Sequence, residues 1–69
     1  MNDWQKIHST DKLHQADIIM HLLEEKGFNP VLINKKDTNY HIGLYEIYVI
    51  RTFVLDSIKA ISEETDFNK

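Results

Sequence analysis

The chain has 69 residues, a formal net charge of −3 and no cysteine. This length allows one domain at most, spanning residues 1–69, with an ordered core expected over about residues 4–62. Without cysteine, no disulfide or thiolate metal site can stabilise the fold, so the core must come from the 42% of residues that are hydrophobic.

Charge and hydropathy exclude several classes of protein. Eight Lys and Arg residues stand against eleven Asp and Glu residues, which argues against nucleic-acid binding because that function requires a basic surface. The N-terminal residues Met1–Lys6 lack the apolar segment of a secretory signal, and no apolar run approaches the roughly 20 residues of a membrane span. We therefore expect a cytoplasmic protein that does not contact membranes.

The first half of the chain predicts a strand and a helix. The strand is expected over Trp4–His8. The helix follows and ends before Gly27, because glycine adopts the left-handed conformation at low cost. Its buried stripe is expected to comprise Leu13, Ala16, Ile19, Met20 and Leu23.

The second half predicts two further strands and a second helix. One strand is expected over Val31–Asn34, a polar loop over Lys35–Gly43, and a strand rich in Tyr, Ile and Val over Leu44–Ile50. Thr52 is a candidate cap for the second helix. The inward stripe of that helix is expected to comprise Val54, Ile58 and Ile61.

The element order β-α-β-β-α is typical of a ferredoxin-like split β-α-β unit that lacks its last strand. The long connection between the first two strands leaves room for the third strand between them. This predicts an α+β two-layer sandwich, with both helices on one face of an antiparallel-containing sheet of order 1-3-2. The first strand would be an exposed edge, and unpaired edges invite another chain.

Side-chain alternation divides the sheet into a helix-covered face and an open face. The open face is expected to carry Trp4, Lys6, His8, Leu32, Asn34, Leu44, Glu46, Tyr48 and Ile50. The residues of the second strand expected to point inward are Val31 and Ile33. Because apolar patches rimmed by charge mark contact sites, Trp4 and Tyr48 are candidate anchors, with a pair formed by Lys6 and Glu46 beside them. The alternative is a sheet whose large side chains merely cover one another.

The polar loop is a second candidate contact element. Lys35, Lys36, Asp37 and Tyr40 could meet a ligand there, because a long loop deforms easily around one. In the alternative, Asp37 and Asn39 form side-chain turns that hold a hairpin, with Tyr40 folded over it. Turn chemistry explains most of these residue types, so the structural role is favoured.

Catalytic and metal-binding patterns are weak. The serines lack an elbow motif such as G-x-S-x-G, and two glycines do not make a phosphate-binding loop. His14, Asp17 and His21 share one side of the first helix, but their spacing fixes no fourth ligand, and zinc prefers four. Trp4 and Tyr48 could imitate an RNA-stacking platform, but the motif that accompanies one is missing. We expect no enzyme activity, no metal and no cofactor.

From Trp4 to about Ile61, the chain resembles a family of short bacterial domains of unknown function that are described as prokaryotic signal-transducing proteins. The residues that carry the resemblance are Trp4, Ala16, Leu22–Gly27, Asn34–Asp37, Tyr40, Gly43 and Glu46–Val49. The resemblance implies a ferredoxin-like sensor module, similar in outline to nitrogen-regulatory signal proteins, and it implies no catalytic residues.

The chain departs from this family in its second helix, where Phe53–Leu55 replaces an acidic, polar first turn. Consecutive helical residues point about 100° apart, so three in a row cannot all face one sheet. Phe53 or Leu55 is therefore expected to face solvent or a partner.

The sequence thus predicts a small, non-enzymatic binding or regulatory module of the cytoplasm, and the resemblance implies a bacterial one. It would recognise a protein or a small molecule through the open face and the loop 35–43. The alternative is a structural homodimer or accessory subunit, built on the edge of the first strand or on Phe53 and Leu55.

Overall fold

A computed structural model describes residues 3–37 and 42–65 of the chain. The elements in chain order are β1 (Trp4–Thr10), α1 (Leu13–Glu25), β2 (Val31–Asp37), β3 (Ile42–Ile50), the short 3-10 helix η1 (Arg51–Phe53) and α2 (Val54–Glu64). This order confirms the predicted β-α-β-β-α arrangement. Within the described ranges, neither α-helix is long and apolar enough to cross a membrane.

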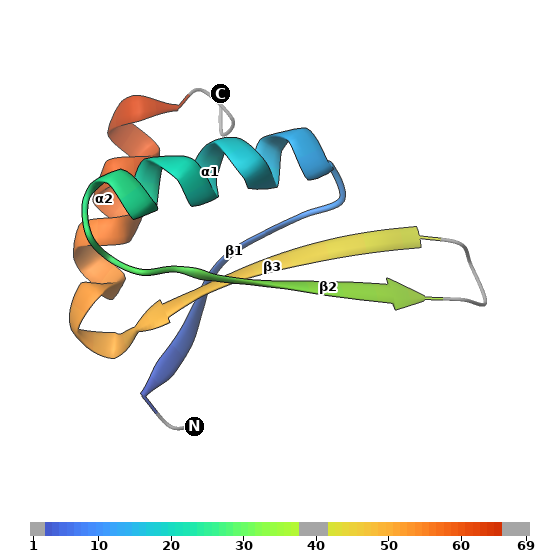
Figure 1. Cartoon of the computed structure of the whole chain (residues 1–69), viewed down its shortest axis with the longest axis horizontal. Helices are drawn as coiled ribbons and strands as arrows, with labels where there is room; N and C mark the ends of the chain where they lie inside the picture. The colour runs from blue at the N-terminus through green and yellow to red at the C-terminus, as the bar shows by residue number, and fades with distance from the viewer. Residues whose placement is uncertain (1–2, 38–41, 66–69) are drawn as a thin grey trace.

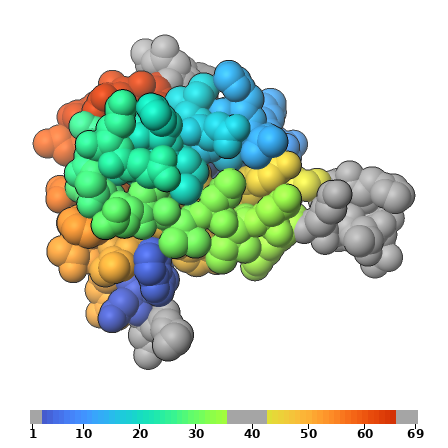
Figure 2. Space-filling view, in the orientation of Figure 1, coloured from blue at the N-terminus to red at the C-terminus, as the bar shows by residue number. Residues whose placement is uncertain are grey.

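The sheet has the predicted strand order. β3 lies in the centre and pairs antiparallel with β1 on one side and β2 on the other, giving the order β1-β3-β2. Both α-helices lie over the same face of the sheet (Figure 1), and the atoms of α1 lie directly against those of β2 (Figure 2). The opposite face is uncovered by any element that the structure describes.

The core lies between the two helices and the central strand. Its buried apolar residues are Ala16, Ile19 and Leu23 of α1, Ile47 and Val49 of β3, and Ala60 and Ile61 of α2. Two predicted core positions are wrong. Leu13 is half exposed because it begins α1, and helical side chains lean over the preceding turn, which Leu13 lacks. Ile58 is exposed because Ser57, the residue before it on α2, faces the core. The spacing of apolar residues alone does not indicate that a serine lies on the buried side of this helix.

The end of α1 is fixed by backbone hydrogen bonds around Gly27. Gly27 adopts a φ of 84°, its N–H donates to the Glu24 carbonyl at 3.0 Å, and the Phe28 N–H donates to the Leu23 carbonyl at 3.1 Å. This is a Schellman motif, in which the left-handed residue satisfies the last carbonyls of the helix. Phe28 then stacks on Phe53, with ring centroids 5.0 Å apart, and closes this end of the core.

All three strands are longer than predicted. β1 continues to Thr10, whose Oγ1 accepts a hydrogen bond from the Lys12 N–H at 3.1 Å just before α1 begins. β2 continues to Asp37 and β3 begins at Ile42, so the predicted loop over Lys35–Gly43 is mostly a strand ladder. Figure 1 shows this β2–β3 hairpin extending past the helices. The polar, exposed Lys35 is stable there because that part of the sheet is not covered on both faces.

Thr52 does not cap the second helix. It lies within η1, and no side chain that the structure describes caps the start of α2. An ion pair instead ties the ends of the two helices together: Lys26 Nζ lies 2.8 Å from Glu64 Oε2, and this contact raises the pKa of Lys26.

Candidate functional site

The ladder pairing shows which side chains share the open face, because directly opposed residues in an antiparallel pair point to the same side. Tyr48 of β3 is opposite Lys6 of β1 and Val31 of β2, and Glu46 is opposite Ile33 of β2. The larger side chains on the open face are therefore Trp4, Lys6, Val31, Ile33, Lys35, Leu44, Glu46, Tyr48 and Ile50.

The centre of the open face holds a carboxylate with three donors. Glu46 is only 4% exposed. Its Oε1 accepts a hydrogen bond from the Tyr48 hydroxyl at 2.9 Å and lies 3.3 Å from Lys35 Nζ, while its Oε2 lies 3.4 Å from Lys6 Nζ. We call Lys6, Lys35, Glu46 and Tyr48 the charged cluster. It draws one residue from each edge strand and two from the central strand.

The cluster keeps Glu46 ionised. The hydrogen bond from Tyr48 lowers the pKa of Glu46, and the two ammonium groups, with Lys35 the stronger, lower it further against the opposing effect of burial. At neutral pH the carboxylate is therefore fully charged, and its two oxygens are already engaged. Two positive charges and one negative charge leave the charged cluster with a net charge of about +1.

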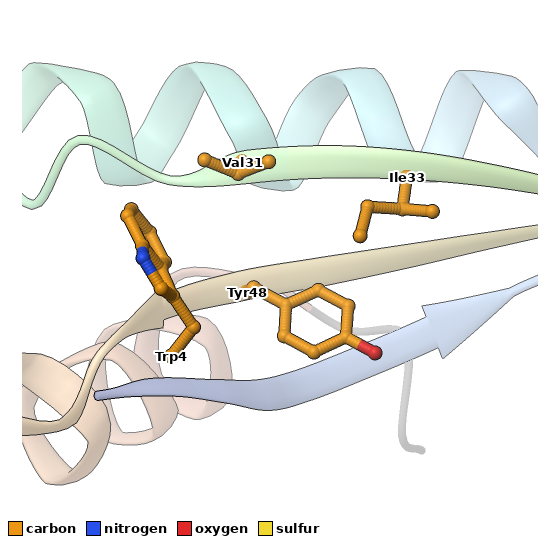
Figure 3. A pocket seen from close by; sticks show the side chains of 4 residues that line it. All are labelled: Trp4, Val31, Ile33 and Tyr48. Atoms are coloured by element: carbon orange, nitrogen blue, oxygen red, sulfur yellow. The ribbon is translucent and has the colours of Figure 1, made fainter. Parts of the chain in front are cut away.

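Next to the charged cluster lies a shallow apolar pocket of about 440 Å³. It is lined by Trp4 of β1, Tyr48 of β3, and Val31 and Ile33 of β2 (Figure 3). Trp4, Val31 and Ile33 each keep about 40% of their surface exposed. The Tyr48 hydroxyl points away from Trp4, so Tyr48 contributes its ring to the pocket and its hydroxyl to the carboxylate.

Four residues of the site were predicted as a group, and the structure brings them together. Trp4, Lys6, Glu46 and Tyr48 all lie on the open face, and the predicted contact between Lys6 and Glu46 is present. The sequence predicts a loop at Lys35, but this residue lies on β2 and joins the same cluster.

The prediction of which side chains on the edge strands point to the open face is partly wrong. Leu32 and Asn34 lie opposite Ile47 and Tyr45 on the helix-covered face, so Val31 and Ile33 are on the open face instead. The run Val31–Ile33 is apolar throughout, so alternation could not indicate which of its residues point inward. Only the pairing of Leu32 with the buried Ile47 decides it.

His8 is on the helix-covered face because β1 contains a bulge. The register shifts between Lys6 and His8, so the alternation reverses there and His8 lies opposite Ile47. Its Nε2 is buried and has no hydrogen-bond partner among the described residues.

The remaining predicted residues lie away from this site or cannot be placed. Tyr40 and the side chains of Lys36 and Asp37 are outside the part of the chain that the structure describes. Leu55 is 81% exposed on α2, whereas Phe53 packs against Phe28.

The histidines of α1 form no metal-binding group with other residues that the structure describes. Within residues 3–37 and 42–65, no three His, Cys, Asp or Glu residues are grouped to hold a metal ion. His21, one of the candidate ligands, instead contacts Glu25 one turn along the helix, at 3.3 Å. Both side chains are largely exposed, so this is an ordinary surface pair.

Comparison of this chain with protein-family models, with curated proteins and with solved structures finds no match. Its function is therefore inferred from the geometry of the open face.

Proposed function

We propose that this chain is a small, non-enzymatic binding module of a regulatory kind, and that the open face is its working surface. One observation carries the proposal: exposed apolar side chains border a carboxylate that is buried and held by three donors. Rigid aromatic anchors beside an oriented charged group are the usual components of a recognition site.

The state of Glu46 supports recognition over catalysis. A general acid or base works best with a pKa near the operating pH and needs a free position toward the substrate. The pKa of Glu46 is lowered, away from neutrality, and both of its oxygens already have partners within the cluster. Its role in this proposal is to position Lys6, Lys35 and Tyr48.

The sensor-type function implied by the family resemblance is compatible with such a module, and we propose signal transduction in the bacterial cytoplasm as its setting. The ligand is a protein or a small molecule that contacts Trp4 and Ile33 at the pocket.

Affinity capture from a native lysate tests this function. The intact protein is compared with Trp4→Ala/Ile33→Ala, and with Ile18→Ala as a control that removes an exposed apolar side chain from α1. Bound proteins and small molecules are identified by mass spectrometry. A ligand retained by the intact protein and the control but lost by the double variant supports the open face. Identical captures from all three proteins exclude it as the working surface.

A second candidate function is that of a structural homodimer. One observation on α2 favours it. Leu55 and Ile58, one turn apart on α2, are 81% and 47% exposed. Two copies could cover these residues by packing helix against helix. Sedimentation velocity of the intact protein and of Leu55→Asp decides: a dimer that Leu55→Asp dissociates supports this function, and a monomer at high micromolar concentration rules it out.

A further inference from the structure

We propose that the ligand of the open face is a small apolar monoanion, with its apolar body in the pocket and its anionic group at the ammonium groups of Lys6 and Lys35. This inference rests on the proposed function and specifies the ligand. It follows from three properties of the site: the volume and lining of the pocket, the direction in which the lysines remain free to donate, and the net charge of the cluster.

The pocket has the size and lining of a small-molecule site. Its volume of about 440 Å³ falls within the roughly 300–1,000 Å³ of such sites, toward the lower end. Two aromatic rings, Trp4 and Tyr48, are on one side and two branched aliphatic chains, Val31 and Ile33, on the other (Figure 3). This lining matches a compact apolar or aromatic body.

The lysines remain able to bind an anion. An ammonium group has three N–H donors, and on each lysine the contact with Glu46 leaves donors available for a ligand. The side chains of Lys6 and Lys35 are 50% and 59% exposed, while that of Glu46 is 5% exposed. A ligand that approaches from solvent therefore meets the two ammonium groups before it meets the carboxylate.

Both ammonium groups also lie within reach of the pocket. Lys6 is opposite Tyr48 in the β1–β3 ladder, and Lys35 follows Ile33 by two positions on the same face of β2. A ligand whose body lies on Tyr48 and Ile33 therefore has its polar end toward the two lysines.

The charges favour an anion over a cation. A cationic ligand would face two ammonium groups, and the one carboxylate nearby already has three partners. An anion with a single charge neutralises the net +1 of the cluster. Anions with several charges would leave an excess of negative charge beside a buried carboxylate, which is unfavourable.

Two dyes that differ by one anionic group test the inference. Anilinonaphthalene sulfonate is an apolar aromatic monoanion, and phenylnaphthylamine is the same ring system without the sulfonate. Each is titrated at low salt against the intact protein, Lys6→Gln, Lys35→Gln, Trp4→Ala and the exposed-helix control Lys59→Gln. Dissociation constants come from dye fluorescence, and amide chemical shifts locate the bound dye.

We expect Lys6→Gln and Lys35→Gln each to weaken sulfonate binding by about three- to tenfold, as for one charge-assisted contact, and to change binding of the neutral dye by less than about twofold. Trp4→Ala weakens both dyes, and Lys59→Gln changes neither. In a protein that remains folded, Glu46→Gln should strengthen sulfonate binding, because it removes the competing negative charge.

The outcomes separate this inference from the proposed function. If Trp4→Ala weakens both dyes but the two lysine changes leave sulfonate binding as it was, the open face binds ligands without preferring anions, and only this inference is overturned. If Trp4→Ala weakens neither dye, the pocket does not bind, and the proposed function fails with it. Far-ultraviolet circular dichroism of each variant ensures that the dyes report on folded protein.

Discussion

Ser57 provides a sharp test of the packing, because we expect its replacement by alanine to stabilise the protein. This serine of α2 is fully buried, and its Oγ has no hydrogen-bond partner among the described residues. An unpaired buried hydroxyl costs about 1–3 kcal/mol. Alanine is also the better helix former, by about 0.5 kcal/mol.

Ser57→Ala should therefore raise the free energy of unfolding by roughly 1–2 kcal/mol, after subtraction of the dispersion energy that the oxygen atom contributes to the core. A chain of this length has about 3–10 kcal/mol of stability in all. For a domain of this size, the change corresponds to an increase in Tm of roughly 5–15 °C.

The same helix supplies a matched control. Ser62 is exposed, and its hydroxyl donates to the Lys59 carbonyl at 3.0 Å. Ser62→Ala gains the same helix propensity but loses that hydrogen bond, so its Tm should stay close to that of the intact protein. Thermal and urea unfolding followed by circular dichroism measure both variants. If Ser57→Ala lowers the Tm, or raises it no more than Ser62→Ala does, the Ser57 hydroxyl is satisfied and the packing argument is wrong.

Three further perturbations test other features of the fold. Leu23→Ala should lower the free energy of unfolding by about 2–5 kcal/mol because this leucine is fully buried, whereas exposed Leu55→Ala should change it by less than about 0.5 kcal/mol. Equal losses of stability in urea unfolding would contradict the assigned core. Gly27→Ala should destabilise the protein by about 1 kcal/mol, because Gly27 has a φ of 84° and nothing lies within 4 Å of an added Cβ. At Gly43, an added Cβ meets only ordinary van der Waals contacts, so Gly43→Ala should be tolerated. Hydrogen bonding and the nearby ammonium groups lower the pKa of Glu46 below 4.5 in the folded state, so its stabilising contribution is complete above about pH 4.5 and is lost as the pH falls through the folded-state pKa. Urea midpoints over this range should therefore fall more steeply for the intact protein than for Glu46→Gln, and parallel curves would refute the assignment.

The architecture was predictable because local signals and topology agree. Gly27 marks the end of α1, and the length of chain between β1 and β2 leaves space for β3 between them. The open-face position of Glu46 also followed from alternation along a strand whose neighbours, Tyr45 and Ile47, pack inward.

The remaining parts of the site depend on pairing between distant segments, which a periodic pattern does not contain. Val31 and Ile33 could be assigned to either face until the register with β3 was known. The bulge at Lys6/His8 is likewise a property of two strands together. The residue types around Lys35 predict a loop, because strand extensions beyond the helices tolerate polar residues that are otherwise typical of turns.

The strand order has a kinetic consequence for the open face. The β2–β3 hairpin closes a short segment of chain, but the contact between Lys6 and Glu46 joins residues 40 positions apart. Each doubling of a closed loop costs about 0.6 kcal/mol, so docking β1 costs roughly 2 kcal/mol more in chain entropy than closing the hairpin. Non-local pairings of this kind form late in folding.

Trp4 and Lys6 both belong to that late-forming strand, whereas Val31, Ile33 and Lys35 belong to the hairpin. The pocket therefore exists only while β1 is docked. A ligand held across it would connect the last segment to fold with the first, and would slow amide hydrogen exchange along β1 more than along β2.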